Sequence, residues 1–416
     1  MKNKFPIRYF NGSALEIFPT QLLDSGLKFF EETIAFKNDL TGETGIDGLL
    51  IDFNDGLRLQ IPSGNWHVRI SDGASDMIFF DEDISSTLLI SKEKFFVEWE
   101  IALWLDGEPV FYHRFDPRGQ SIHFWFGQAM GDNIALLPYV EQFRQKFDCR
   151  TTCTVPPYMR EIVSKYYPRL ELTEDIPDDS YACFYMAAWS NMPFAAAQDF
   201  RTVPLELLGK TVLCSPLIRR PLKKIFEPTA PRSIKEKYVC IAVQASGTNK
   251  CWLAPDGWDH VVDYLKSLGY RVLCIDRDRR CENYGLTIEM PRGAEDFTGN
   301  RPLTDRINML AYADFFIGLG SGLSWLAWSV DIPVIMISGF SEPWYEFDNP
   351  YRIYNPTVCH GCFNDMRVDF SRVATCVSYK DAARKYECSK KIAARTVIET
   401  IDRLIAEKCV APPRGD

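Results

Sequence analysis

Residues 313–327 read Ala-Asp-Phe-Phe-Ile-Gly-Leu-Gly-Ser-Gly-Leu-Ser-Trp-Leu-Ala, and this stretch decides the fold class. Its apolar run at 315–319 predicts a buried strand, and the apolar residues of 323–330 predict a helix directly afterwards. The glycines between them let a ligand approach the backbone, and the new helix offers N–H groups to an anion. Gly-rich turns are common, so this one indicates a ligand site only together with its neighbours.

The segments on either side repeat the alternation of strand and helix. Predicted strands cover 239–244, 271–275 and 334–338, and predicted helices cover 258–268 and 303–313. Such repeats imply a parallel sheet with helices on both faces, whose ligands bind beyond the carboxyl ends of the strands. Residues 244–250, Gln-Ala-Ser-Gly-Thr-Asn-Lys, reach the same edge and bring Lys250 to it. A cation beside a helix N-terminus suits a diphosphate leaving group, on which negative charge accumulates.

The N-terminal part of the chain has a different pattern. Short alternating strands over 48–115 predict a small β-barrel-like domain, either a barrel or a curled sheet. After Pro117, a strand at 122–126 and a helix at 132–147 begin a first βα lobe. The Pro-rich and basic stretch 202–231 predicts an interdomain linker in its later half. We therefore expect a β-rich domain at 1–117, a Rossmann-like lobe at 118–230, and a second lobe at 231–416 with a C-terminal helix from about 385 to 409 that packs on the core.

Composition excludes some classes of protein. The 416 residues carry a formal net charge of −9 without a block of like charges, which argues against a nucleic-acid partner and an anionic membrane surface. The sequence predicts neither a membrane span nor an apolar leader, so we expect a cytoplasmic protein. The 13 cysteines should be reduced in that compartment, and most of the scattered ones should be buried thiols.

Four cysteines form a separate pattern, with the spacing Cys-x2-Cys-x13-Cys-x11-Cys. They are Cys359, Cys362, Cys376 and Cys388. A Cys-x2-Cys turn lets two thiolates reach one metal ion, and two more thiolates complete a tetrahedron. The spacing does not distinguish zinc from iron, and Cys409 is a spare candidate for the less certain third or fourth ligand. Because four thiolates leave no open coordination position, we expect a structural metal finger at about 359–388.

Three segments in the second lobe resemble motifs of the bacterial lipopolysaccharide heptosyltransferases. Residues 248–252, with Asp256-Gly257-Trp258 after them, resemble the Lys-x-Trp-Pro segment of that family. Asp296-Phe297-Thr298-Gly299 resembles its Asp-Leu-Thr-Gly, and 311–327 resembles its Ala-Asp-x-x-(Ile/Val) motif that ends in His-Leu-Ala. Gly320 stands where that family has Asp, Trp325 where it has His, and Leu253 where it has Pro.

The first lobe carries a matching turn. Met130-Gly131-Asp132, with Pro138 further on, resembles the Leu-Gly-Asp turn of the same family, whose Asp is the catalytic base. The resemblance thus implies that Asp132 is the base. Inverting displacement at an anomeric carbon needs one carboxylate to deprotonate the incoming hydroxyl. From the residues alone, Asp132 could equally be a helix N-cap.

The N-terminal β domain, the two-lobed core and the four cysteines together resemble the bacterial autotransporter heptosyltransferases. This resemblance implies an α/β fold with two Rossmann-type lobes in the GT-B arrangement. It further implies an ADP-heptose donor, serine acceptors on an autotransporter passenger, iron in the four-cysteine site and a dodecameric ring. The residues implied to hold the donor are Gln244, Thr248, Lys250, Ser321, Gly322, Leu323, Ser324 and Glu342.

Other interpretations stay open at this stage. The chain could be a lipopolysaccharide-core heptosyltransferase or another nucleotide-sugar transferase. It could also be an iron-containing electron carrier, in which the α/β core would be only a scaffold without a catalytic role. A non-catalytic glycan-binding protein is a third alternative, because aromatic residues make up 13% of the sequence. Asp276 and Asp278 could contact a ribose hydroxyl, although a solvated loop is the preferred interpretation.

Overall fold

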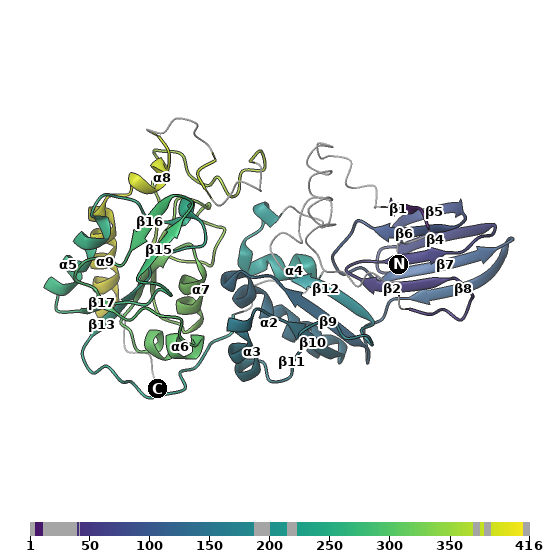
Figure 1. The fold of residues 1–416 in the computed structure, drawn as a ribbon, viewed down its shortest axis with the longest axis horizontal. Coiled ribbons are helices and arrows are strands. Elements are labelled where there is room, and N and C mark those ends of the chain that lie inside the picture. The colour runs from purple at the N-terminus through teal and green to yellow at the C-terminus, as the bar shows by residue number, and fades with distance from the viewer. Residues whose placement is uncertain are drawn as a thin grey trace. The chain divides into compact units, whose positions relative to one another are not determined.

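The computed structural model describes residues 5–10, 40, 42–186, 200–213, 223–368, 375–377 and 384–410, which divide into two compact units (Figure 1). The first unit comprises Met1–Gln128, Leu136–Val203 and Leu207–Leu222, and the second comprises Ala129–Ala135, Pro204–Glu206 and Lys223–Asp416. Part of the predicted linker, 214–222, lies outside the described residues. The domain boundaries expected at 117 and 230 stay predictions.

The second unit is built on a six-stranded parallel sheet. In spatial order its strands are β17 (Glu295–Asp296), β14 (Arg271–Cys274), β13 (Tyr238–Ile241), β18 (Phe316–Leu319), β19 (Val334–Ile337) and β20 (Arg352–Ile353). All its pairings are parallel, which confirms the parallel sheet expected from the sequence. The chain builds outward from β13 in one direction and then from β18 in the other. The order therefore reverses between these two strands, at the position where doubly wound sheets bind ligands.

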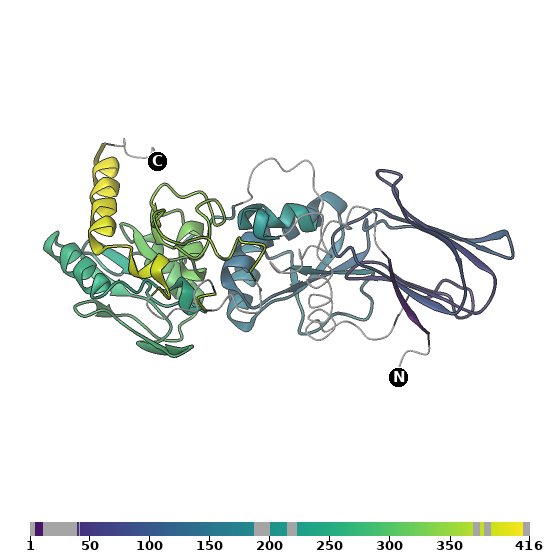
Figure 2. The ribbon, with the colours of Figure 1, turned by 90° about the horizontal axis from the view of Figure 1, so that it is seen from above.

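Helices cover both faces of this sheet. They are α5 (Gly257–Ser267), α6 (Leu303–Ala311), α7 (Gly322–Ser329), α8 (Glu387–Lys390) and α9 (Ala394–Val410). Figures 1 and 2 show α5 and α9 side by side, and Figure 1 shows α6 and α7 on the opposite face. The buried residues Val397, Ile401 and Leu404 of α9 join the same apolar core as Val261 of α5. The C-terminal helix thus packs as expected, but α8 and α9 divide it into two helices. The hairpin β15 (Arg280–Asn283) and β16 (Leu286–Glu289) completes the unit.

The first unit contains an eight-stranded mixed sheet. Its spatial order is β1 (Ile7–Phe10), β6 (Thr87–Ser91), β3 (Arg58–Ile61), β2 (Leu50–Asn54), β12 (Ala182–Met186), β9 (Ser121–Phe126), β10 (Arg150–Thr154) and β11 (Glu171–Leu172). Along this order, the neighbours among β2, β12, β9, β10 and β11 pair in parallel. The pairs β2–β3 and β3–β6 are antiparallel. Its helices are α3 (Arg160–Tyr166), α4 (Leu208–Val212) and most of α2, which spans Met130–Phe147.

The N-terminal part is rich in β structure, as expected, and of the two expected arrangements its described strands form open sheets and not a closed barrel. Strands β5 (Ile78–Ile84), β4 (Trp66–Asp72), β7 (Trp99–Leu105) and β8 (Glu108–Arg114) form an open antiparallel sheet. The other N-terminal strands instead extend the parallel sheet of the lobe. Consecutive residues Ile51, Asp52 and Phe53 of β2 are all buried, so this strand is covered on both faces and suits the interior of a larger sheet.

In the part of the chain that the structure describes, every helix is too short or too polar to cross a lipid bilayer.

Candidate donor site and cysteine cluster

The glycine-rich turn lies at the reversal point of the second unit's sheet. It leaves β18 and enters α7, whose N-cap is Ser321 in an extended conformation. Ser324 is buried, and its hydroxyl donates a 2.5 Å hydrogen bond to the carbonyl of Leu319. Ser324 therefore holds the turn in shape, while Gly322 and Leu323 begin the helix and direct its positive end toward the edge of the sheet.

Two glycines of this turn are closely packed against other parts of the unit. A Cβ atom at Gly320 would lie 2.4 Å from Oε1 of Glu346, and one at Gly322 would lie 2.7 Å from Cβ of Met130. The sequence had suggested that these glycines admit a ligand, but protein atoms also require their small size. An Asp at position 320, as in the lipopolysaccharide enzymes, would bring its carboxylate against Glu346.

Glu346 belongs to a buried polar network that the sequence analysis missed. It forms an ion pair with Arg352, and both side chains are only 5% exposed. The hydroxyl of Ser341 donates to both carboxylate oxygens of Glu346, at 2.8 and 2.9 Å. The Arg352 guanidinium also donates to the carbonyl of Ser341 at 2.9 Å. In the sequence these residues are single polar residues without a recognisable spacing, so no motif could have identified the network.

The second loop of the edge, 244–250, is fixed at its start by Asp276. The amides of Val243 and Gln244 donate to the Asp276 carboxylate at 2.7 and 3.2 Å. Asp276 is only 2% exposed, so the solvated loop that we preferred is wrong for this residue. The side-chain amide of Gln244 donates to the carbonyl of Asp278 at 2.7 Å. Gln244 and Asp276 thus shape the loop where it leaves the sheet.

Burial raises the pKa of Asp276 to about 6, although the amides of Val243 and Gln244 oppose this shift. In the folded protein the Asp276 carboxyl therefore stays protonated up to about pH 6, whereas in the unfolded chain it ionises above its ordinary pKa of 3.8. The resulting stabilisation is fully present below about pH 3.8 and is lost as the pH rises through about 6, at roughly 1.4 kcal/mol per pH unit between these values.

We expect urea unfolding to detect this dependence when the wild type and Asp276→Asn are compared at about pH 4.5 and about pH 7. The wild type should lose free energy of unfolding relative to the variant at the higher pH. If the wild type and Asp276→Asn differ in free energy of unfolding by the same amount at both pH values, Asp276 does not have a raised pKa. Loss of the hydrogen bonds from the Val243 and Gln244 amides would by itself have an effect that does not depend on pH.

The other two predicted donor residues of this loop have different surroundings. Thr248 is fully buried, and its hydroxyl lies 2.8 Å from that of Tyr386. Lys250 is half-buried, and its Nζ lies 5.4 Å from the centroid of the Phe340 ring. Among the described residues, no carboxylate forms an ion pair with Lys250. The loop therefore presents a positive charge that the described protein does not neutralise.

Asp132 groups with the second unit, together with the rest of 129–135. Helix α2 begins at Met130, so Asp132 is the third residue of the helix and not its N-cap, and its side chain is half-buried. A Cβ at Gly131 would lie 2.8 Å from the Trp325 ring, and Met130 packs on Gly322. The first turn of α2 therefore lies against the first turn of α7, beside the candidate donor turn.

The four cysteines of the predicted finger line one small cavity of about 20 Å³, together with Asn249, His360 and Tyr386. Burial, together with the neighbouring thiols of Cys376 and Cys359, raises the pKa of Cys362 to about 12. The backbone N–H of Tyr386 donates to Sγ of Cys376 at 3.4 Å. Four thiols and an N–H donor to sulfur are the groups that a thiolate-bound zinc or iron ion requires. The residues therefore fit such an ion chemically.

In the described ranges, no three His, Cys, Asp or Glu side chains are grouped closely enough to hold an ion. Parts of the finger, 369–374 and 378–383, and the Cys409 side chain lie outside the described residues. Glu342, whose contact with the donor stays a prediction, lies against the cysteine turn. Its carboxylate is 4.0 Å from Nε2 of His360, and a Cβ at Gly361 would contact it at 2.0 Å.

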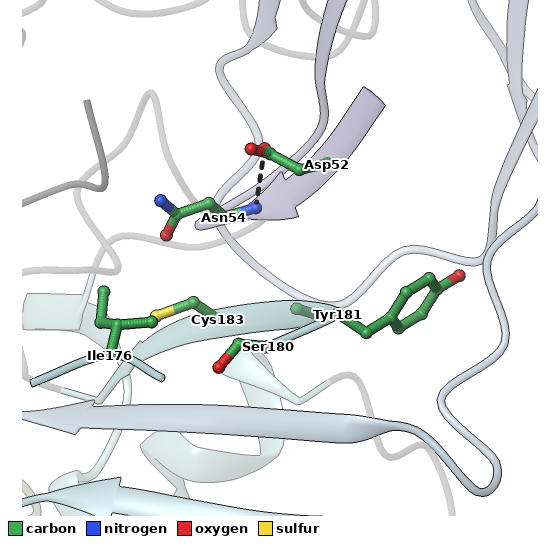
Figure 3. Close-up of a pocket in the computed structure, with 7 residues that line it drawn as sticks. Asp52, Asn54, Ile176, Ser180, Tyr181 and Cys183 are labelled. Atoms are coloured by element: carbon green, nitrogen blue, oxygen red, sulfur yellow. Dashed lines mark hydrogen bonds between the residues drawn. The ribbon is translucent and has the colours of Figure 1, made fainter. Parts of the chain in front are cut away.

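A second small cavity lies in the first unit (Figure 3). It measures about 10 Å³, and its lining includes Asp52, Asn54 and Ser180. The Asn54 side chain points into it, is 6% exposed, and makes no hydrogen bond to another described residue. A cavity of this size and polarity suits one water molecule and is too small for a sugar or a nucleotide.

Comparison with known proteins identifies two family matches. Residues 45–107 match the family described as "Glycosyltransferase TibC, N-terminal domain", and residues 194–352 match "Glycosyltransferase family 9 (heptosyltransferase)". The autotransporter heptosyltransferase TibC of Escherichia coli O78:H11 is 36% identical over 379 residues, covering 88% of this chain and 92% of TibC. The inactive autotransporter heptosyltransferase BimC of Burkholderia thailandensis is 29% identical over 384 residues, covering 89% of each protein.

Solved structures extend the comparison to the fold. Two crystal structures of E. coli TibC align with TM-scores of 0.83 and 0.82, at 34% and 35% identity. They cover 89% of this chain and 99% and 98% of the TibC chains. TibC is described there as an iron-containing dodecameric glycosyltransferase, and one of the two structures is a complex with ADP-D-beta-D-heptose. Because the similarity in sequence and fold covers nearly nine-tenths of the chain, the protein belongs to the autotransporter heptosyltransferase family.

Proposed function

We propose that this protein transfers a heptosyl group from ADP-heptose to serine hydroxyls of an autotransporter passenger, with inversion at the anomeric carbon. The observation that carries the proposal is the position of loops 244–250 and 318–324 in a member of this family. Both loops leave neighbouring strands, β13 and β18, at the reversal point of the sheet, where doubly wound folds bind nucleotides.

The proposed reaction is a single displacement. The serine oxygen attacks the anomeric carbon, the bond from that carbon to the diphosphate oxygen breaks, and ADP leaves. Asp132 accepts the serine proton as general base. Lys250 and the N-terminus of α7 supply positive charge to the departing diphosphate, whose negative charge grows in the transition state.

Other predicted donor residues have supporting roles in this proposal. Ser321 caps α7, and Gly322 and Leu323 provide its first turn. Ser324 and Gln244 keep the two loops in shape through their hydrogen bonds to Leu319 and Asp278.

We also propose that Cys359, Cys362, Cys376 and Cys388 hold one iron ion. The four thiols lining one cavity support this, as does the iron found in TibC, and zinc is the alternative ion. Such an ion would cross-link the 359–388 segment in the folded protein. The same relative supports a dodecameric assembly. We propose a cytoplasmic location for this enzyme, because cysteine thiols stay free to bind a metal ion in a reducing compartment.

Mass spectrometry of an autotransporter passenger tests the function. The purified protein should add mass in steps of one heptose when supplied with ADP-heptose, and should release one ADP per step. It should add nothing when UDP-glucose replaces the donor. If a passenger that a related heptosyltransferase modifies gains no heptose with this protein, the proposed transferase activity is wrong.

The relative BimC gives a specific reason to consider an inactive protein as the second candidate, because it is named as inactive. An inactive member could still bind ADP-heptose. Calorimetry with ADP in parallel with the transfer assay separates the two, since binding without release of ADP would favour the inactive alternative.

A further inference from the structure

The segment that follows Cys376 is joined to the second donor loop by several buried contacts. Besides the Thr248–Tyr386 hydroxyl pair, the amide of Leu253 donates to Ser389 at 2.8 Å, and Ser389 donates to the carbonyl of Cys251 at 2.5 Å. The Trp252 indole N–H donates to the carbonyl of Ile392 at 2.9 Å. Residues 386–392 therefore hold the loop along its length from 248 to 253.

These contacts are shielded from water. Thr248 is 0% exposed, and Tyr386, Ser389 and Trp252 are each 4% exposed. Hydrogen bonds in such surroundings are strong, and removal of one partner leaves the other unsatisfied. The position of the loop therefore depends on the position of the 386–392 segment.

Tyr386 is the residue that contacts both sites. Its backbone N–H donates to Sγ of Cys376, its side chain lines the cavity of the four cysteines, and its hydroxyl meets Thr248. Its backbone is in the left-handed conformation, with φ of 61°, which is uncommon for a residue other than glycine. Thr248 in turn lies two residues before Lys250, in the same short helical turn (Thr248–Lys250).

We propose that Tyr386 couples the cysteine cluster to the donor loop, as a positioning residue for Thr248 and Lys250. An ion held by the cysteines fixes the Tyr386 backbone, and the Tyr386 hydroxyl fixes the loop that receives the diphosphate. Coupling of this kind is reciprocal, so metal and nucleotide each strengthen the binding of the other. The nucleotide part of this inference rests on the proposed function.

A double-mutant cycle on iron-loaded protein tests the coupling. Tyr386→Phe removes only the hydroxyl and keeps the N–H that meets Cys376, and Thr248→Val removes the other hydroxyl. Each change should raise the Kd for ADP by about 5- to 10-fold, the effect of one buried hydrogen bond. The double variant should be no weaker than either single variant, because both remove the same contact. Tyr351→Phe, which removes a hydroxyl bonded to the exposed Glu407, is the matched control and should bind ADP as the wild type does.

Two further measurements separate this inference from the proposed function. Amide hydrogen exchange of 247–253 in nucleotide-free, iron-loaded protein should be faster in Tyr386→Phe than in the wild type, while iron content stays at the wild-type level. Unchanged exchange of 247–253 in the Tyr386→Phe variant would overturn the coupling. Failure of the wild type to bind ADP would instead count against the proposed function, whatever the exchange rates.

Discussion

Asp132→Asn should lower kcat by about 100- to 10,000-fold, because the amide cannot accept the proton of the attacking serine. The Kd for ADP should change little, since the proposed nucleotide contacts come from α7 and from loop 244–250. Asp132→Asn replaces a carboxylate by a neutral amide and keeps the size of the side chain. Release of ADP from ADP-heptose in the presence of a passenger gives kcat, and calorimetry gives the Kd.

The chain provides a matched control for this variant. Asp305 is also the third residue of a helix, α6, and lies on the surface, so Asp305→Asn removes the same charge from an equivalent first turn. It should transfer heptose at the wild-type rate. If Asp132→Asn retains activity within a few-fold of Asp305→Asn, then Asp132 is not the base.

The second large effect is expected from Arg352→Met. This change leaves the Glu346 carboxylate buried without its partner, directly beneath Gly320 of the donor turn. Breaking a buried ion pair from one side typically costs about 3–5 kcal/mol, because the remaining charge is desolvated and uncompensated. Urea unfolding should show a loss of this size in the free energy of unfolding.

Two comparisons make the result specific. Arg395→Met removes an exposed pair with Glu399, whose side chains are 87% and 59% exposed, and should cost no more than about 1 kcal/mol. The double change Arg352→Met with Glu346→Leu should recover much of the lost stability, since no unpaired charge remains. If Arg352→Met costs as little as Arg395→Met, the pair does not support the donor turn.

The sequence predicted those features of the fold that depend on local pattern. Apolar runs separated by Gly-rich turns marked β13, β18 and α7, and the parallel sheet follows from their alternation. Pairing between distant strands was not accessible in this way. The strands of 48–115 alternate as barrel strands do, and nothing local shows that β2 pairs with β12, more than 120 residues later.

The same limit applies to the candidate site. Lys250 and the turn 318–324 could be proposed from the sequence because their residue types and spacing are typical of anion-binding sites. Thr248 was expected to face the donor, but its partner Tyr386 lies 138 positions away, and only the folded chain brings the two hydroxyls together. Asp276 resembles any polar residue after a strand, and its burial results from the packing around it. The four cysteines were recognisable as a set, because thiols at that spacing have few other uses.

The pairing of β2 with β12 has a consequence for how such a protein can be divided and recombined. The strands before residue 117 share backbone hydrogen bonds with the first lobe, so they are not a module attached by a tether. Cutting the chain after that point would strip four strands from one side of an eight-stranded sheet and leave the amides and carbonyls of β12 bare. Bare strand edges recruit other chains and promote aggregation. Exchange of this region between relatives must therefore preserve the register Ala182↔Phe53 and Cys183↔Asn54, so an engineered junction has to be placed outside this strand pair.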